Sequence, residues 1–155
     1  MVAFLKDRRG ATTIQFLLIV PILLVLVIGG TELWKMLHVK QTMNDAAYQA
    51  VRLVAMQPNH GGGDIRIQAA QLVRRYISTN PYVDPRLRAD PDDQNLLRVR
   101  VDYDSLSVGA EVEVVVQLYW VVGRDWGVSE WIPFLGRGGW LETTATGWVL
   151  GEEED

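Results

Sequence analysis

The 155-residue chain contains no cysteine, so disulfides, thiolate metal sites and a thiol nucleophile are all excluded. Histidine is scarce as well, since only His38 and His60 occur, and neither stands in a metal-ligand pattern such as H-E-x-x-H. The chain also lacks a G-x-S-x-G serine, and its glycine run at residues 61–63 lacks the Lys-Ser/Thr of a phosphate-binding loop. We therefore expect no catalytic residues, no cofactor, no metal and no enzyme activity.

Charge is absent from residues 10–30, and from residue 14 to residue 30 only Gln15 is polar. Together with residues 11–13, this apolar run reaches the roughly 20 residues that span a bilayer. In hydrocarbon the backbone must satisfy its own hydrogen bonds, so a lone span is a helix. Pro21 removes one amide donor from that helix but leaves ample apolar side chain to hold it in lipid. The sequence therefore predicts a transmembrane helix at residues 11–31.

The basic side chains lie before this span, within a leader of residues 1–10 that carries Lys6, Arg8 and Arg9. Because cytoplasmic flanks are rich in Lys and Arg, the N-terminus should stay inside and the rest of the chain outside the cytoplasmic membrane. A cleavable secretory signal would have a shorter apolar region and small residues at its cleavage site. A plain signal anchor explains the hydropathy as well as any more specialised signal does.

Several residues around the start of the span form a more specific pattern: Arg8, Arg9, Gly10, Ala11, Gln15, Phe16 and Pro21. This pattern resembles the class III signal of type IV pilin-like proteins, and in detail the TadE-like pseudopilins of tight-adherence (Flp) pili. The resemblance implies that a prepilin peptidase cuts after Gly10 on the cytoplasmic side and leaves Ala11 as the first mature residue. The family usually carries glutamate where this chain has Gln15, and an amide binds a neighbour's amino terminus more weakly than a carboxylate does.

Net charge argues against one class of partner. Residues 31–155 carry twelve bases and eighteen acids, a net charge of −6, within a total of −4. Phosphate backbones would repel such a domain, so we expect no direct nucleic-acid binding.

Helical periodicity continues beyond the span and predicts an extracytoplasmic stem at residues 32–57. Its apolar stripe consists of Met43, Ala46, Ala47, Ala50, Val51 and Val54. After a turn at residues 58–63, Asp64 is suited to cap a second amphipathic helix that extends to about Ser78. The buried face expected for that helix consists of Ile65, Ala69, Leu72, Val73 and Tyr76. Residues 80–93 hold three prolines and are expected to form an irregular connector.

Beyond residue 96 the apolar period changes from helical to two. Alternation at residues 97–103 and 112–120 predicts two antiparallel strands, and Trp140 begins a third that runs from residue 141 to residue 150. The fold class is therefore α+β, with a pilin-like outer domain at residues 58–150 in which helices pack on a small antiparallel sheet. An acidic tail at residues 151–155 follows, which is expected to be solvated and has no clear role.

Two features allow alternative interpretations. Trp126, Trp131 and Phe134 lie in a long loop, where they either complete the core or form a contact surface for a partner. Glu32, at the outer end of the span, is either an interfacial charge or a partner for a basic group on a neighbouring subunit. Gln15, Pro21 and Glu32 are the candidate assembly residues.

These observations and the resemblance favour a minor pilin or pseudopilin that takes part in assembling a tight-adherence pilus or a related secretion filament. Its expected partners are the membrane, other pilin-like subunits bound through the N-terminal helix, and prepilin peptidase. Its expected location is the bacterial cytoplasmic membrane, in a single pass, with later incorporation into an extracellular filament. The alternative is a signal-anchored extracytoplasmic binding module that uses the Trp-rich loop.

Overall fold

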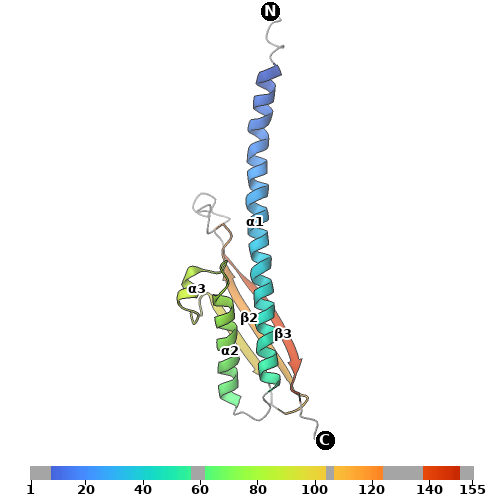
Figure 1. Ribbon diagram of the computed structural model, residues 1–155, viewed down its shortest axis with the longest axis vertical. Coiled ribbons are helices and arrows are strands. Elements are labelled where there is room, and N and C mark those ends of the chain that lie inside the picture. The colour runs from blue at the N-terminus through green and yellow to red at the C-terminus, as the bar shows by residue number, and fades with distance from the viewer. Residues whose placement is uncertain (1–7, 57–61, 104–106, 124–137, 151–155) are drawn as a thin grey trace, which may run out of the picture. The chain divides into compact units, whose positions relative to one another are not determined.

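The computed structural model describes residues 8–56, 62–103, 107–123 and 138–150. The elements are helices α1 (Arg8–Ala55), α2 (Gly62–Ser78) and α3 (Pro85–Ala89), followed by strands β1 (Leu97–Tyr103), β2 (Glu111–Trp120) and β3 (Gly139–Trp148). The predicted α+β class, with a long first helix, a second helix and a small antiparallel sheet, is confirmed (Figure 1). The chain divides into two compact units, Met1–Lys35 and Met36–Asp155.

Helix α1 is a single 48-residue helix that passes Pro21 without interruption. Its C-terminal part carries the predicted stripe, and the exposed fraction of every side chain in that stripe is 6% or less. The helix ends shortly before Pro58, where the amide of Leu150, just beyond β3, donates a hydrogen bond of 3.1 Å to the carbonyl of Ala55. This bond satisfies one of the carbonyl groups that the last turn of a helix leaves without an intrahelical donor.

Helix α2 ends at Ser78, as predicted, but differs from the prediction in its start and in its buried face. It begins at Gly62, two residues before the expected cap at Asp64. Its fully buried positions are Ile65, Ala69, Val73 and Ile77, whereas Tyr76, which was expected in the core, is 38% exposed. Positions 76 and 77 both border the stripe, and the aliphatic side chain of Ile77 can be buried without a hydrogen-bond partner while a tyrosine hydroxyl requires one.

The connector at residues 80–93 is less irregular than predicted, because it contains α3. The Asp84 side chain accepts a 2.8 Å hydrogen bond from the amide of Arg86, and Pro85 occupies the first helical position. Both features favour helix initiation. Leu87 is fully buried, so this short helix adds one anchor to the core.

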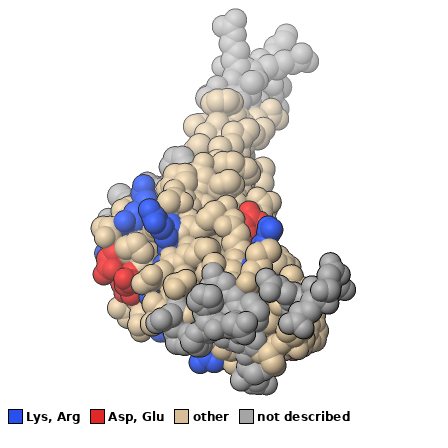
Figure 2. Space-filling view, turned by 60° about the horizontal axis from the view of Figure 1, so that its bottom comes forward, with Lys and Arg blue, Asp and Glu red and all other residues tan. Residues whose placement is uncertain are grey.

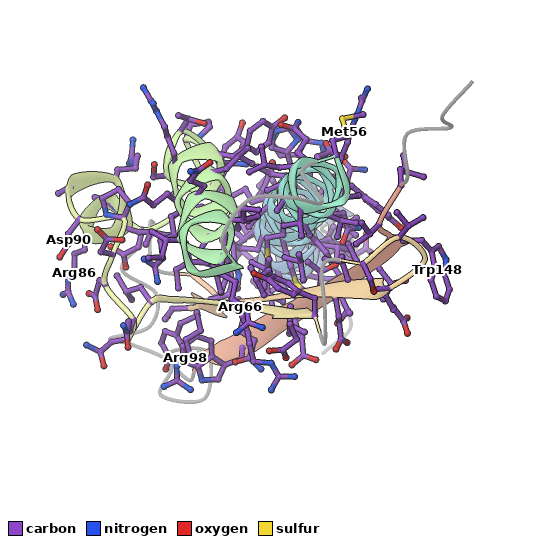
Figure 3. All side chains as sticks on the ribbon, turned by 90° about the horizontal axis from the view of Figure 1, so that it is seen from below. Met56, Arg66, Arg86, Asp90, Arg98 and Trp148 are labelled. Atoms are coloured by element: carbon purple, nitrogen blue, oxygen red, sulfur yellow. The ribbon has the colours of Figure 1, made fainter. Side chains whose placement is uncertain are left out.

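The sheet is an antiparallel meander in the order β1-β2-β3. Val101 pairs with Val114, and Val114 pairs with Ala145, so the buried side chains of the three strands lie in register. The alternation predicted for β2 is confirmed, because its side chains from Val112 to Trp120 are buried at every second position. The Met36–Ala55 part of α1 and helix α2 cover one face of the sheet (Figures 1 and 3).

Contacts distant in sequence fix α1 on this face. The hydroxyl of Thr143 in β3 donates a hydrogen bond to the side-chain oxygen of Asn44. On the other side of α1, the buried Asn80 donates from Nδ2 to the hydroxyl of Thr42 at 2.7 Å. The same amide accepts a 2.9 Å bond from the amide of Tyr82, so both of its polar ends are satisfied.

Candidate membrane-spanning and assembly helix

The N-terminal part of α1 exposes nearly all of its apolar side chains. The large apolar residues that the structure describes between Ile14 and Val27 are 52% to 70% exposed, apart from the partly buried Val20. They occupy consecutive positions, so they cover the whole circumference of the helix and not a stripe. In Figure 2 the rod toward this end is tan, the colour of uncharged residues. A helix that is apolar all round requires an apolar environment on every side.

The length of this segment matches a bilayer. At about 1.5 Å per residue, residues 14–31 extend about 27 Å, close to the roughly 30 Å of a hydrocarbon core. Among the described residues, α1 is the one helix long and apolar enough to cross a membrane, and none of its apolar window is buried. The predicted span at residues 11–31 therefore lies on a continuous helix.

The predicted processing and assembly residues all lie along α1. Gly10 and Ala11 belong to its first turn, which begins at Arg8. Gln15 and Pro21 are both exposed. Among the described residues no hydrogen bond to the Gln15 side chain is present, so its amide is available to a neighbouring molecule.

Glu32 has a partner that the sequence analysis missed. Its carboxylate lies 3.1 Å from Nζ of Lys35, and the residue is only 7% exposed. The signal was present in the sequence, since an acid and a base three positions apart share one helix face. The Glu32 carboxylate thus already has one partner in its own chain. That it also binds a basic group on a neighbouring subunit stays a prediction.

The glycine pair at the C-terminal end of the predicted span leaves an open surface. A Cβ placed on Gly29 or Gly30 would meet no heavy atom within 4 Å. Glycine lets helix backbones approach closely, so this surface is suited to contact with another helix.

The aromatic loop residues and the two histidines add no further evidence for a functional site. Trp126, Trp131 and Phe134 lie outside the described residues, so the choice between core and contact surface stays a prediction. His38 packs edge-on against Tyr82, with ring centroids 5.4 Å apart, and His60 lies outside the described residues. Within the part of the chain that the structure describes, no group of three or more His, Asp or Glu residues is placed to hold a metal ion.

Fold and helix together define a class of protein, in which one N-terminal membrane helix leads into a small α+β domain. Residues 10–52 match the model of the family described as TadE-like protein, and this match covers nearly the whole of α1. The resemblance inferred from Arg8–Pro21 is thereby confirmed, and it indicates a pilus-associated membrane protein of the tight-adherence system. Neither the curated proteins nor the solved structures give a match.

Proposed function

We propose that the protein is a minor pilin-like subunit, or pseudopilin, that acts by assembly and not by catalytic turnover. The observation that carries this proposal is the circumferential exposure of apolar side chains at residues 14–27, on the helix that matches the TadE-like family. A binding module anchored in the membrane needs only hydropathy there. A filament subunit needs a helix whose apolar surface can leave lipid and pack against other helices. Glycines with open space around them allow that packing to be close.

In this mechanism the same apolar surface of α1 contacts lipid before assembly and the helices of other subunits after it. In the bilayer the apolar side chains contact lipid, and in a filament or its initiating complex they pack against the helices of other subunits. Lipid tails are as apolar as leucine, so helix association depends on close van der Waals packing. The open surface at Gly29 and Gly30 supplies a place where such packing can be close.

Processing precedes assembly. The basic leader keeps the N-terminus in the cytoplasm, and prepilin peptidase cuts the bond between Gly10 and Ala11 at the inner edge of the membrane. Glycine on the scissile bond has no Cβ, so the backbone of the peptidase can approach it closely. The new amino terminus of one subunit then donates a hydrogen bond to the side-chain oxygen of Gln15 on another.

N-terminal sequencing and intact mass of the protein, isolated from membranes that contain the cognate peptidase, test this proposal. We expect a mature chain that begins at Ala11, and we expect Gly10→Val to abolish the cut. Gly29→Val is the matched control, because that glycine lies in the same helix with open space around it. An uncut chain that begins at Met1 in the wild type would refute the proposal and favour a plain signal anchor.

A further inference from the structure

A groove of about 310 Å³ lies between α2 and β1, on the described part of the Met36–Asp155 unit, which we call the outer unit. Three arginines line it, Arg66 and Arg74 from α2 and Arg100 from β1. Its apolar lining includes Ile67, Val99 and Val101, and Ile67 is 57% exposed. We call this site the arginine groove. It combines an apolar surface with cationic side chains.

The three guanidinium groups retain unused hydrogen-bond capacity. Arg66 donates from Nη2 to the carbonyl of Tyr103 at 3.0 Å and lies 4.2 Å from the centre of the Tyr103 ring. Arg74 donates to Asp92 at 2.7 Å, while its buried Nε–H has no acceptor in the described structure. Arg100 lies 2.6 Å from Asp102. Each guanidinium carries five N–H donors, so most of them remain available.

The ion pairs already present do not close the groove. The side chains of Asp92 and Asp102 are 73% and 50% exposed, and exposed pairs of this kind are weak and readily exchanged. A ligand with several carboxylates and an apolar portion could bind the remaining donors and the apolar lining together. Such a ligand is complementary to the groove in both charge and polarity.

The end of the chain has this chemistry. Trp148 and Leu150 are about 60% exposed, and the sequence continues with Glu152, Glu153, Glu154 and Asp155. The described strands beside this segment, residues 107–123 and 138–150, contain no Lys or Arg. The last turn of α1, where Leu150 donates a hydrogen bond to Ala55, carries one basic residue, Arg52.

We propose that the C-terminal segment of one copy, residues 148–155, docks in the arginine groove of a second copy. The inference rests on the proposed function, because assembled subunits would supply the proximity that a short segment needs. The two surfaces are different, so the contact is heterologous and can repeat from copy to copy without closing. It would add a contact between outer domains to the packing of α1 helices.

The strand order favours a second copy over the segment's own groove. Two strand spacings, about 10 Å, separate β3 from β1, and the groove lies beyond β1. Trp148 would stay behind in β3, at the opposite edge of the sheet from β1, and it lies well apart from Arg66 in Figure 3. Only another copy can bring Trp148 and the acids to the groove together.

Disulfide cross-linking tests the contact directly, because the full-length chain has no cysteine of its own. Gln71→Cys places a thiol in the groove, and Glu154→Cys places one in the tail. We expect the two variants, produced together in the membrane, to form a mixed disulfide dimer. Arg66→Gln combined with Arg100→Gln in the groove copy should lower its yield about tenfold, because each lost charge-assisted hydrogen bond weakens docking. Arg88→Gln is the matched control, an exposed arginine on α3 outside the groove.

Three results would overturn the inference. The first is absence of the mixed dimer, and the second is an unchanged yield in the Arg66→Gln, Arg100→Gln variant when its melting temperature equals that of the wild type. The third is a chain with both cysteines that forms its disulfide only within the monomer. Sequencing for Ala11 and cross-linking through Gly30→Cys report processing and α1 contacts independently. If those signals persist without the tail-to-groove link, this inference fails and the proposed function stands.

Discussion

The two parts of α1 differ in the density of apolar residues and in their environment: twelve of 14 residues are apolar between Ile14 and Val27, and twelve of 20 between Met36 and Ala55. Between Ile14 and Val27 apolar residues fill consecutive positions, and most of their surface is exposed. Between Met36 and Ala55 they form a stripe, and Met43 and Val54 in that stripe are fully buried. The difference shows that the density and the arrangement of apolar residues together distinguish the part that requires lipid or other helices from the part that supports its own domain.

Residue size differs between the two parts as well. The buried stripe uses Ala46, Ala47 and Ala50, which bring the helix backbone close to α2 and the sheet. The exposed part uses Leu, Ile and Val, which maximise contact with a fluid environment. Deleting side-chain volume should therefore have opposite consequences in the two parts, since only the stripe can be left with a cavity.

The largest effect expected is that of Met43→Ala, compared with Leu23→Ala in the same helix. Met43 is fully buried, so its truncation leaves a cavity and should lower the free energy of unfolding by about 2–5 kcal/mol. Leu23 is 54% exposed, and its truncation should leave the unfolding of the outer unit unchanged. Denaturant unfolding of the full-length protein in detergent, followed through its tryptophans, measures both. Equal losses in the two variants would contradict the division of α1 into two environments.

A charge introduced into α1 sharpens the comparison. Leu24 and Leu37 are equally exposed, at 52% and 53%, but only Leu24 lies in the predicted span. Leu24→Arg should make membrane insertion less favourable by about 2.5–3.5 kcal/mol, whereas Leu37→Arg should have little effect. Carbonate extraction of membranes, with the fraction retained in the pellet as readout, distinguishes them. Equal retention of Leu24→Arg and the wild type would argue that residues 14–31 do not span a bilayer.

The elements with a clear period could be predicted from sequence, and those that depend on local capping or tertiary contacts could not. The stripe in α1 and the alternation in β2 were predicted residue by residue, because each is a repeated pattern that one face of the element must bury. Helix α3 was missed because prolines at positions 81, 85 and 91 suggested irregular chain. One of them, Pro85, instead favours the helix start that Asp84 caps.

The remaining difference between the predicted and the observed core lies where two adjacent helix positions could both belong to the buried face. Tyr76 and Ile77 both fit a helical stripe, and only the packed structure shows that Ile77 is buried. For the candidate site, the sequence located the span and Gln15 but not the pairing of Glu32 with Lys35. The arginine groove was not predictable from the sequence, because Arg66 and Arg100 lie 34 positions apart and meet only when α2 packs beside β1.

The smallest effect expected concerns the close approach of α1 and β3 at Gly147. A Cβ on Gly147 would overlap the Cγ1 atom of Val51, while a Cβ on Gly139 at the start of the same strand would meet nothing within 4 Å. Valine in a helix has one strongly preferred rotamer, so Val51 cannot easily turn away. Gly147→Ala should therefore lower the free energy of unfolding by about 1–3 kcal/mol, as overpacking does elsewhere. Gly139→Ala should leave it nearly unchanged.

The double variant Gly147→Ala, Val51→Ala tests the cause of that loss. Removing the two methyl groups of Val51 makes room for the new Cβ, so the effects of the two substitutions should not add, and the double variant should recover part of the stability lost by Gly147→Ala. Denaturant unfolding of the four proteins of this cycle gives the coupling energy. Strict additivity would mean that α1 and β3 do not meet at these residues, and that the Met36–Ala55 part of α1 is held to its sheet by its other contacts.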